Sequence, residues 1–385
     1  MSKSKKKLIP ELRFPEFIND GEWRKEIVSN YIDFQTGYPF KSKDFTQKEQ
    51  GLRLIKNRDL KADDRIVYYT GDYDDDYIVN DGDILVGMDG DFTPIIWTGG
   101  KALLNQRVGR IQPKKNTHLP FFHYFLFLAL RRIESITART TVKHLSHSTV
   151  EKITEPLPKQ KEQQKIAACL SSLDELLTAH KYKLTTLQRH KKGLLQNLFP
   201  QEGQTVPTYR FNEFEGDGEW VENPFDKLFK IGNGRDYKHL NKGDIPVYGS
   251  GGLMLFVDDY LYEGESVCIG RKGTIDNPIF LTGKFWTVDT LFYTYNFGKN
   301  VPKFIFYLFQ NINWLKHNQA GGVPSLSKKN LYRIKKYLPK PKEQQKIAAC
   351  LSAVDDLITA QQEKIDVLEL HKKGLLQGLF PRIEN

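Results

Sequence analysis

Basic, amide and hydroxyl side chains are grouped in turn-like segments of two stretches of this chain. Lys and Arg can neutralise phosphate groups, and Arg, Asn and Gln can also hydrogen-bond to the edges of nucleic-acid bases. The candidates in the first stretch are Lys41, Lys43, Asn57, Arg58, Asn105, Gln106, Arg107, Lys143 and His144. Those in the second stretch are Arg235, Lys238, Lys242, Ser250, Arg271, Lys272, Lys328 and Lys329. Their recurrence in equivalent turns favours a binding surface over scattered solvated charges.

The composition supports a polyanionic partner. The 385 residues carry a net charge of +10, with an isoelectric point near 9.1. Such an excess favours nucleic acid first and a membrane surface second. The hydrophobic fraction of 39% indicates folded domains, and the length indicates two or three of them.

Motifs for catalysis or metal binding do not reach the required patterns, and we expect neither a catalytic residue nor a metal site. Asn277-Pro278-Ile279-Phe280 lacks the second proline of the NPPY-type motif that frames a flipped adenine. Asp72, Asp74 and Asp76 alternate as in a calcium loop, but Tyr77 stands where glycine is required. Cys169, Cys268 and Cys350 form no CxxC pair, so we expect reduced cysteines without zinc.

The elements that must position the candidate residues are set out by a long internal repeat. Residues 161–200 return as residues 342–381, an offset of 181 positions, with 27 of 40 residues identical. In both copies apolar residues alternate at spacings of four and three, which predicts a coiled-coil helix. The predicted seam in the first copy is Ile166, Leu170, Leu173, Leu177, Leu184, Leu187, Leu194 and Leu198. In the second copy it is Ile347, Leu351, Val354, Ile358, Ile365, Leu368, Leu375 and Leu379.

Each repeated helix is preceded by a divergent region with a related opening. The frame of residues 13–23 recurs as residues 210–220, so both regions begin alike and end at the same motif. Short runs such as Asp83–Val86 and Ser266–Ile269 predict strands, whereas Leu119–Ile136 and Val301–Lys316 predict helices. We therefore divide the chain into four predicted segments: 1–158, 159–200, 201–339 and 340–385.

Taken together, the duplicated helices, the GEW openings and the Leu-Ser endings resemble the specificity (S) subunits of type I restriction–modification systems. Segments Thr36–Ser42, Ile55–Asn57 and Leu104–Arg107 are similar to parts of that family's target recognition domains. In the second region, Tyr248–Gly252 and Gly321–Ser327 are similar to that family as well, whereas Thr140–Ser146 departs from the latter pattern.

The resemblance implies an α+β fold, with two mixed α/β target recognition domains separated by two conserved helices that pair as an antiparallel, pseudo-twofold coiled coil. It implies that each domain reads one half of a bipartite, asymmetric site in double-stranded DNA. It further implies two methyltransferase subunits that carry S-adenosylmethionine, and motor-nuclease subunits that use ATP and Mg²⁺. The chain itself would bind no cofactor and catalyse nothing.

Two alternatives from other classes remain at this point. A stand-alone DNA adenine methyltransferase needs a cofactor pocket, for which the sequence has no motif. A coiled-coil scaffold joining two protein-binding domains would bind DNA without the steep salt dependence of phosphate contacts. The basic N-terminal residues are not followed by the apolar run of a secretory signal, and no apolar run reaches the length of a membrane span. We therefore expect a cytoplasmic protein with no membrane partner.

Overall fold

The structure is a computed structural model that describes residues 8–62, 64–136 and 143–383. Residues 140–142 of the divergent segment noted above lie outside this description. Contacts between residues divide the chain into two compact units. Unit 1 comprises Met1–Ala179 with Asp366–Asn385, and unit 2 comprises His180–Ile365. Both boundaries fall inside the two long helices, so each unit contains part of each helix.

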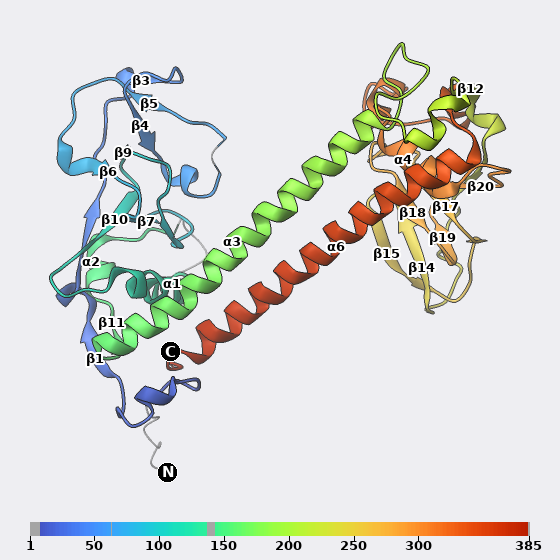
Figure 1. Cartoon of the computed structure of the whole chain (residues 1–385). Helices are drawn as coiled ribbons and strands as arrows, with labels where there is room; N and C mark the ends of the chain where they lie inside the picture. The colour runs from blue at the N-terminus through green and yellow to red at the C-terminus, as the bar shows by residue number, and fades with distance from the viewer. Residues whose placement is uncertain (1–7, 63, 137–142, 384–385) are drawn as a thin grey trace. The chain divides into compact units, whose positions relative to one another are not determined.

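Two sheets build the globular part of unit 1 (Figure 1). An antiparallel sheet has the order β2 (Ile32–Thr36), β10 (Val108–Pro113), β7 (Ile84–Gly87) and β8 (Pro94–Ile96). A mixed sheet has the order β3 (Phe45–Thr46), β5 (Tyr68–Tyr69), β4 (Leu52–Ile55), β9 (Ala102–Leu104) and β6 (Ile78–Val79). A two-stranded antiparallel ribbon joins the two ends of the first variable region. It consists of β1 (Arg24–Ile27) and β11 (Thr154–Leu157).

Strand β7 joins the two cores of unit 1 because its side chains alternate between faces. Ile84 and Val86 pack into a core that includes helix α1 (Leu119–Ile136) and helix α2 (His147–Glu151). Leu85 packs into a separate core with residues of β4, β9 and β10. All four strand residues are buried, which explains the continuous apolar run in the sequence.

Unit 2 repeats this plan with its own strands. One sheet has the order β13 (Lys230–Asn233), β20 (Leu291–Tyr295), β17 (Ser266–Gly270) and β18 (Ile279–Leu281). The other has the order β15 (Gly252–Val257), β14 (Ile245–Gly249), β19 (Lys284–Thr287) and β16 (Tyr262–Glu263). The ribbon pairs β12 (Val221–Pro224) with β21 (Lys335–Leu338). The two regions thus share a similar strand order despite their divergent sequences, but the mixed sheet of unit 1 has an additional strand, β3.

The helices of the variable regions match the predicted pattern in one unit and differ in the other. Helix α1 has the predicted bounds. In unit 2 the predicted helix over Val301–Lys316 is wrong in its second half. Helix α4 spans Pro302–Gln310 and stops, and a separate 3-10 helix, η8 (Trp314–His317), follows. The interruption contains Asn311 and Asn313, whose side chains favour non-helical backbone. Helix α5 (Lys328–Arg333) completes the unit.

Short 3-10 helices connect these elements. They are η1 (Pro15–Phe17), η2 (Val28–Asn30), η3 (Ser42–Asp44), η4 (Asn57–Leu60), η5 (Asp75–Tyr77), η6 (Asn212–Asp217) and η7 (Phe225–Lys227). The aspartates that suggested a calcium loop belong in part to η5. There the side chain of Asp74 accepts a hydrogen bond from the amide of Asp76 and so caps the turn.

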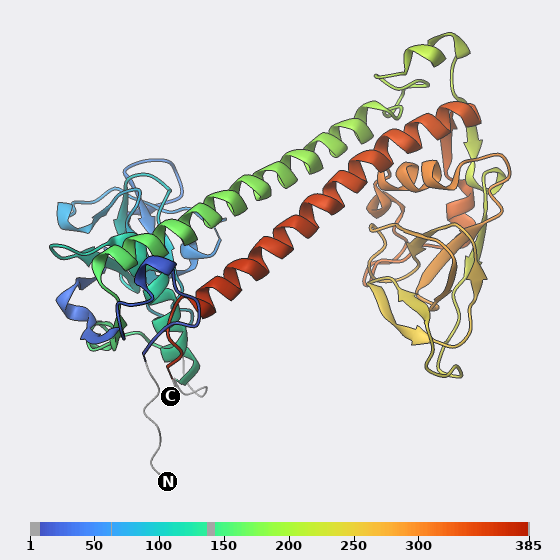
Figure 2. The same cartoon turned by 60° about the horizontal axis from the view of Figure 1, so that its bottom comes forward.

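The long helices are α3 (Gln160–Asn197) and α6 (Pro341–Gly378). Within each unit their segments lie side by side (Figures 1 and 2). In unit 2, His180 contacts Gln361 and Lys191 contacts Asp355, so residue numbers rise along α3 as they fall along α6. The segments therefore pair in the antiparallel sense.

Every predicted seam position of α3 and α6 is buried or half-buried. Between the apolar seam positions, Nε2 of Gln361 donates to the carbonyl oxygen of His180 at 3.0 Å. At the helix ends the seam merges with globular cores. Ile166 and Leu379 belong to the unit 1 core, and Leu198 and Ile347 belong to the unit 2 core.

The start of each long helix is anchored by a buried carboxylate. In unit 1, Glu162 accepts two hydrogen bonds of 2.8 Å from Arg13 and one from the indole of Trp23. In unit 2, Arg210 and Trp220 bind Glu343 in the same way. Both glutamates are 1% exposed. A bidentate guanidinium with an added indole donor satisfies a buried carboxylate, so the recurring RF…GEW frames dock each variable region onto its helix.

Candidate nucleic-acid interface

The candidate residues of unit 1 meet at the turn that follows β7. Residues 88–90 run antiparallel to residues 143–145, with amide-to-carbonyl bonds from Gly90 to Lys143 and from Leu145 to Met88. The amide of Met88 also donates to the carbonyl of Arg107. Backbone hydrogen bonds thus tie segments that are distant in sequence to the C-terminal end of β7, and we call this place the edge of unit 1.

Arg107, His144 and Asp89 form the polar centre of this edge. Nδ1 of His144 lies 2.8 Å from Oδ1 of Asp89, and the guanidinium of Arg107 lies 3.5 Å from the same oxygen. Arg107 is exposed and has a positive φ of 73°, which turns the backbone sharply between β9 and β10. The arginine can donate to phosphate or to base edges, the imidazole offers a further polar group, and the carboxylate can accept from the amino groups of bases.

Asn57, the first residue of η4, supports this turn. Its amide Nδ2 donates to the carbonyl of Asp89 at 2.9 Å, and its buried Oδ1 has no hydrogen-bond partner among the described residues. Nearby, burial raises the pKa of Asp91, but hydrogen bonds from Thr93 and Lys61 outweigh burial and lower that pKa to about 2. Asp91 therefore stays ionised beside the turn at neutral pH.

Unit 2 contains the equivalent edge after β17. The amide of Gly273 donates to the carbonyl of Pro324, and the amide of Leu326 donates to the carbonyl of Arg271. The amide of Arg271 donates to the carbonyl of Thr290, as Met88 does to Arg107 in unit 1. Ser250 also lies here, because a Cβ added at Gly273 would be 3.4 Å from its hydroxyl oxygen.

A hollow of about 340 Å³ opens at this second edge, and we name it the edge hollow. Three predicted residues line it: Arg271, Lys272 and Lys328. Its other lining residues are Asn233, Phe292, Gln319, Ser325, Leu326 and Ser327. The guanidinium of Arg271 lies 6.0 Å from the ring centre of Phe292, which holds it over the sheet. Cations and amides on one concave surface suit phosphate and base contacts.

Other predicted residues lie outside these two edges. Asn105 is 8% exposed, so its side chain is largely withdrawn from solvent, whereas Gln106 beside it is exposed. Arg58 is held by Asp59 and by the carbonyl of Arg65. The remainder are exposed on separate loops or helix surfaces: Lys41, Lys43, Arg235, Lys238, Lys242 and Lys329.

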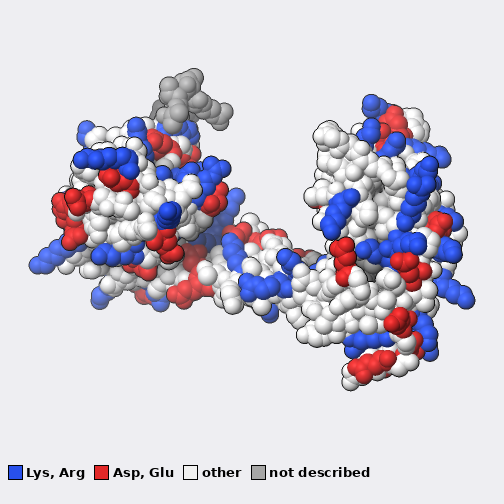
Figure 3. All heavy atoms as spheres, turned by 90° about the horizontal axis from the view of Figure 1, so that it is seen from above, with Lys and Arg blue, Asp and Glu red and all other residues white. Residues whose placement is uncertain are grey.

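Charge alone does not outline the interface. In the view of Figure 3, Lys and Arg side chains are spread over both units and are interspersed with Asp and Glu. The backbone pairing therefore locates the candidate surface better than the net charge does.

Sequence reasoning missed Asp89, Asn233 and Gln319 as members of these edges. Asp89 is acidic, and neither Asn233 nor Gln319 is adjacent in the sequence to a Lys or an Arg. The equivalence of Gly90 and Gly273, which follow similar strands, was the signal that could have found Asp89.

A family model described as the type I restriction modification DNA specificity domain matches residues 24–189 and again residues 218–370. The chain belongs to this family. The two matches cover most of the sequence and fall one on each repeat, which confirms the resemblance drawn from the repeated helices. The protein is thus a DNA-recognition subunit of the type I restriction–modification class, a non-catalytic family, and a stand-alone methyltransferase is not favoured.

Curated relatives carry matching names. The EcoBI specificity subunit of Escherichia coli is 34% identical over 175 residues, which cover 45% of this chain and 37% of that protein. The MjaVIII specificity subunit of Methanocaldococcus jannaschii is 24% identical over 96% of this chain and 91% of that protein. The chain thus spans about a third of one relative and nearly all of the other.

Solved structures share the fold. The S subunit of a type I system from M. genitalium superposes with a TM-score of 0.68 at 18% identity, covering 98% of this chain and all of that one. A chain from a structural study of type I complex assembly gives a TM-score of 0.53 at 15% identity, over 93% and 97% of the two chains. These likenesses support the expected fold of two recognition domains with helical linkers. In the described part of the chain, none of the helices has the length and apolar character needed to cross a membrane.

Proposed function

We propose that this protein recognises a bipartite, asymmetric site in double-stranded DNA, with one variable region reading each half. The observation that supports this most directly is the equivalent edge in each unit, where backbone-tied turns gather different polar side chains. Unit 1 presents Arg107 and His144, and unit 2 presents Arg271, Lys272 and Gln319. One scaffold with two different sets of contacts suits two unlike half-sites.

In this proposal residues 1–158 and 201–339 are the two target recognition domains, and residues 159–200 and 340–385 are the conserved helices. We propose that the helices dock two methyltransferase subunits, which bring S-adenosylmethionine, and that motor-nuclease subunits with ATP and Mg²⁺ join that core. The chain itself would supply no cofactor and no reacting group. Because its proposed partner is cellular DNA, we propose that it works in the cytoplasm.

The paired helices would set the spacer between the half-sites. Two linked readers raise each other's effective concentration, so only DNA with both halves at the right spacing binds tightly. The gapless heptad pattern of both repeats supports a fixed spacing, since a coiled-coil register tolerates no slippage.

Exchange of one variable region tests the proposal. Residues 24–157 would be replaced by the corresponding region of another family member, in a strain that carries the partner methyltransferase. Sequencing of methylated adenines should then show that one half of the recognised site has changed while the other half and the spacer stay the same. A change in both halves, or in neither, would contradict the assignment of one domain to each half-site.

A further inference from the structure

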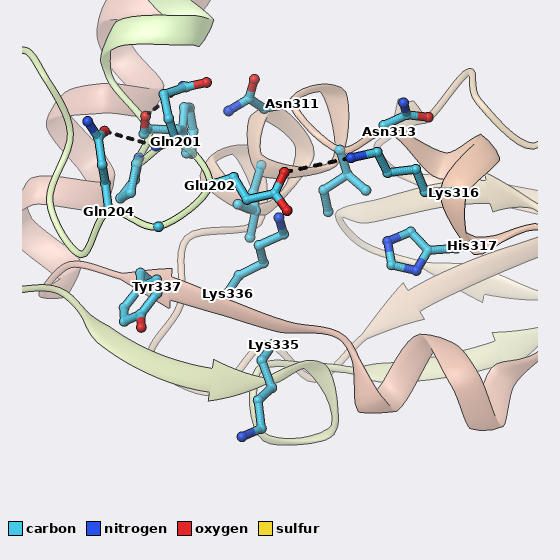
Figure 4. A pocket seen from close by; sticks show the side chains of 15 residues that line it. Gln201, Glu202, Gln204, Asn311, Asn313, Lys316, His317, Lys335, Lys336 and Tyr337 are labelled. Atoms are coloured by element: carbon cyan, nitrogen blue, oxygen red, sulfur yellow. Dashed lines mark hydrogen bonds and ion pairs between the residues drawn. The ribbon is translucent and has the colours of Figure 1, made fainter.

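A second hollow lies in unit 2 and shares no lining residue with the edge hollow (Figure 4). Its volume is about 440 Å³, and we name it the lysine hollow. Three segments line it: residues 199–204 after α3, residues between Leu308 and His317 at the end of α4 and in η8, and residues 335–337 of β21. The early end of α4 and the short η8 therefore help to form it.

The charge of the lysine hollow is positive. Its basic lining residues are Lys316, His317, Lys335 and Lys336, and Glu202 is the one acid among its lining residues. Burial lowers the pKa of Lys336, and Lys316 lowers it further while Glu202 acts in the opposite sense. Burial also lowers the pKa of His317, with contributions from both lysines. Among the lining residues of the hollow, the half-buried Lys336 therefore has no buried carboxylate to balance its charge.

Glu202 provides only a loose partner. Its carboxylate lies 3.7 Å from Nζ of Lys316, and its side chain is 96% exposed. Figure 4 shows the side chains of Lys316 and Lys336 both directed toward it. An ion pair this exposed contributes little to stability and is screened by salt. A carboxylate that is held more firmly in the hollow can therefore displace Glu202.

Unit 1 shows what fills the corresponding place. The repeat offset of 181 puts Glu155 of β11 where unit 2 has Lys336 of β21, and Phe380 where it has Phe199. There the carboxylate of Glu155 accepts hydrogen bonds from the guanidinium of Arg132, and the remaining cavity is only about 10 Å³. In one repeat an internal carboxylate–cation pair closes the space, whereas in the other a cation faces an open hollow.

We propose that the lysine hollow of unit 2 binds an acidic side chain of an associated protein subunit, with Lys336 as its cation. This inference rests on the proposed function only in assuming that protein subunits bind this chain. Side chains of Phe199, Leu308 and Ile312 are buried in its lining, so the recess suits a carboxylate on a short aliphatic stem. A phosphate of duplex DNA is part of a stiff backbone and contacts outer surfaces more readily than a recess.

The full-length protein and a fluorescein-labelled hexaglutamate peptide provide the test, with fluorescence anisotropy as the readout. Lys336→Gln should weaken peptide binding about tenfold, the loss expected for one charge-assisted hydrogen bond. Lys336→Arg should retain binding because it keeps the charge. Glu202→Gln should strengthen binding by removing the competing carboxylate. The matched control is Lys284→Gln, which removes a lysine that rests over Tyr260 outside this hollow.

Equal weakening by Lys336→Gln and Lys284→Gln would overturn the proposal, because it would show non-specific attraction to a basic protein. Binding of a duplex oligonucleotide is measured in parallel. If Lys336→Gln weakens duplex binding as strongly as peptide binding, the hollow is a phosphate site and the proposal is also wrong. Unchanged duplex binding with weakened peptide binding supports it. The peptide measurement reports on unit 2 of the protein alone, whereas the domain exchange reports on which half of the DNA site changes, so the two proposals fail separately.

Discussion

Nζ of Lys191 lies 2.6 Å from Oδ1 of Asp355 in unit 2. The repeat offset of 181 relates this pair to Lys372 and Asp174, which form the same ion pair in unit 1. Each long helix therefore supplies an aspartate to one unit and a lysine to the other. This reciprocity follows from antiparallel pairing of two copies of one sequence within the units, and it explains why both residue types recur in both copies.

The Lys191–Asp355 pair should contribute to stability because it is partly withdrawn from solvent. Tyr307 also donates to Asp355 at 2.7 Å, so loss of the lysine leaves a carboxylate with one strong partner fewer. We expect Lys191→Met to lower the free energy of unfolding by about 1–3 kcal/mol. The control Lys192→Met, at the exposed neighbouring position, should change it by less than about 0.5 kcal/mol. Denaturant unfolding measures both, and similar losses would argue against the pair.

Stability should fall on mild acidification because of His123. Burial lowers the pKa of this histidine from 6.5 to about 4, with Lys372 acting in the same direction and Asp174 opposing. The unfolded chain then binds more protons between these two values, so the stabilisation is complete above pH 6.5 and is lost as the pH falls toward 4. We expect a loss of about 2–3 kcal/mol across this window.

The measurement compares wild type with His123→Gln in denaturant unfolding at several pH values. The variant should show a shallower pH dependence between 6.5 and 4, since one titrating group is gone. Some slope should remain, because burial lowers the pKa of His118 and of His317 as well. An identical slope in both proteins would exclude His123 as the source.

The edge hollow should contact DNA phosphates through its lysines. Lys272→Gln is expected to weaken binding to cognate and unrelated duplexes alike, and to reduce the slope of log K against log salt by about 0.9. Lys284→Gln is again the matched control and should leave the slope unchanged. Gln319→Ala should instead relax the preference for bases in one half-site only. A salt slope that is insensitive to Lys272 would remove this residue from the interface.

The glycines that follow β2 and β13, Gly37 and Gly234, should be irreplaceable. A Cβ at Gly234 would lie 1.9 Å from the carbonyl oxygen of Val288, and one at Gly37 would lie 2.1 Å from that of Asn105. We expect Gly234→Ala to cost about 1–3 kcal/mol in unfolding free energy and to weaken recognition of the half-site read by unit 2. Gly251→Ala, where a Cβ meets nothing within 4 Å, is the control. Equal stability of the two variants would show that the backbone adjusts freely.

The length of the paired helices should determine the spacer. Insertion of a few residues into α3 after Tyr182, which is exposed, shifts the register against α6. We expect the recognised half-sites to move apart or the complex with the methyltransferase to fail to form. Mapping of methylated sites and co-purification distinguish these outcomes. An unchanged spacer with normal assembly would refute the ruler role of the helices.

The amino-acid sequence was sufficient for the repeated framework. The seam from Ile166 to Leu198 was predictable because helical periodicity is local and because a second copy, from Ile347 to Leu379, displays it again. The bounds of α1 were predictable for the same reason. The family resemblance followed from this framework, since the conserved helices and the frames around Trp23 and Trp220 recur at fixed offsets.

Only the tertiary structure decided which polar residues act together. The edge hollow of unit 2 brings together Asn233 at the end of β13, Arg271 after β17 and Gln319 from the loop after η8, and no local pattern encodes contacts between segments so far apart. The structure also distinguishes Asn105, which is buried, from Gln106, which is exposed, although the sequence predicts both equally as DNA-binding residues. The charge change from Glu155 to Lys336 is visible in the sequence, but its consequence depends on the surrounding chain. The lysine faces a cavity lined in part by the end of α4 and by η8, and only the packing of these elements shows that space.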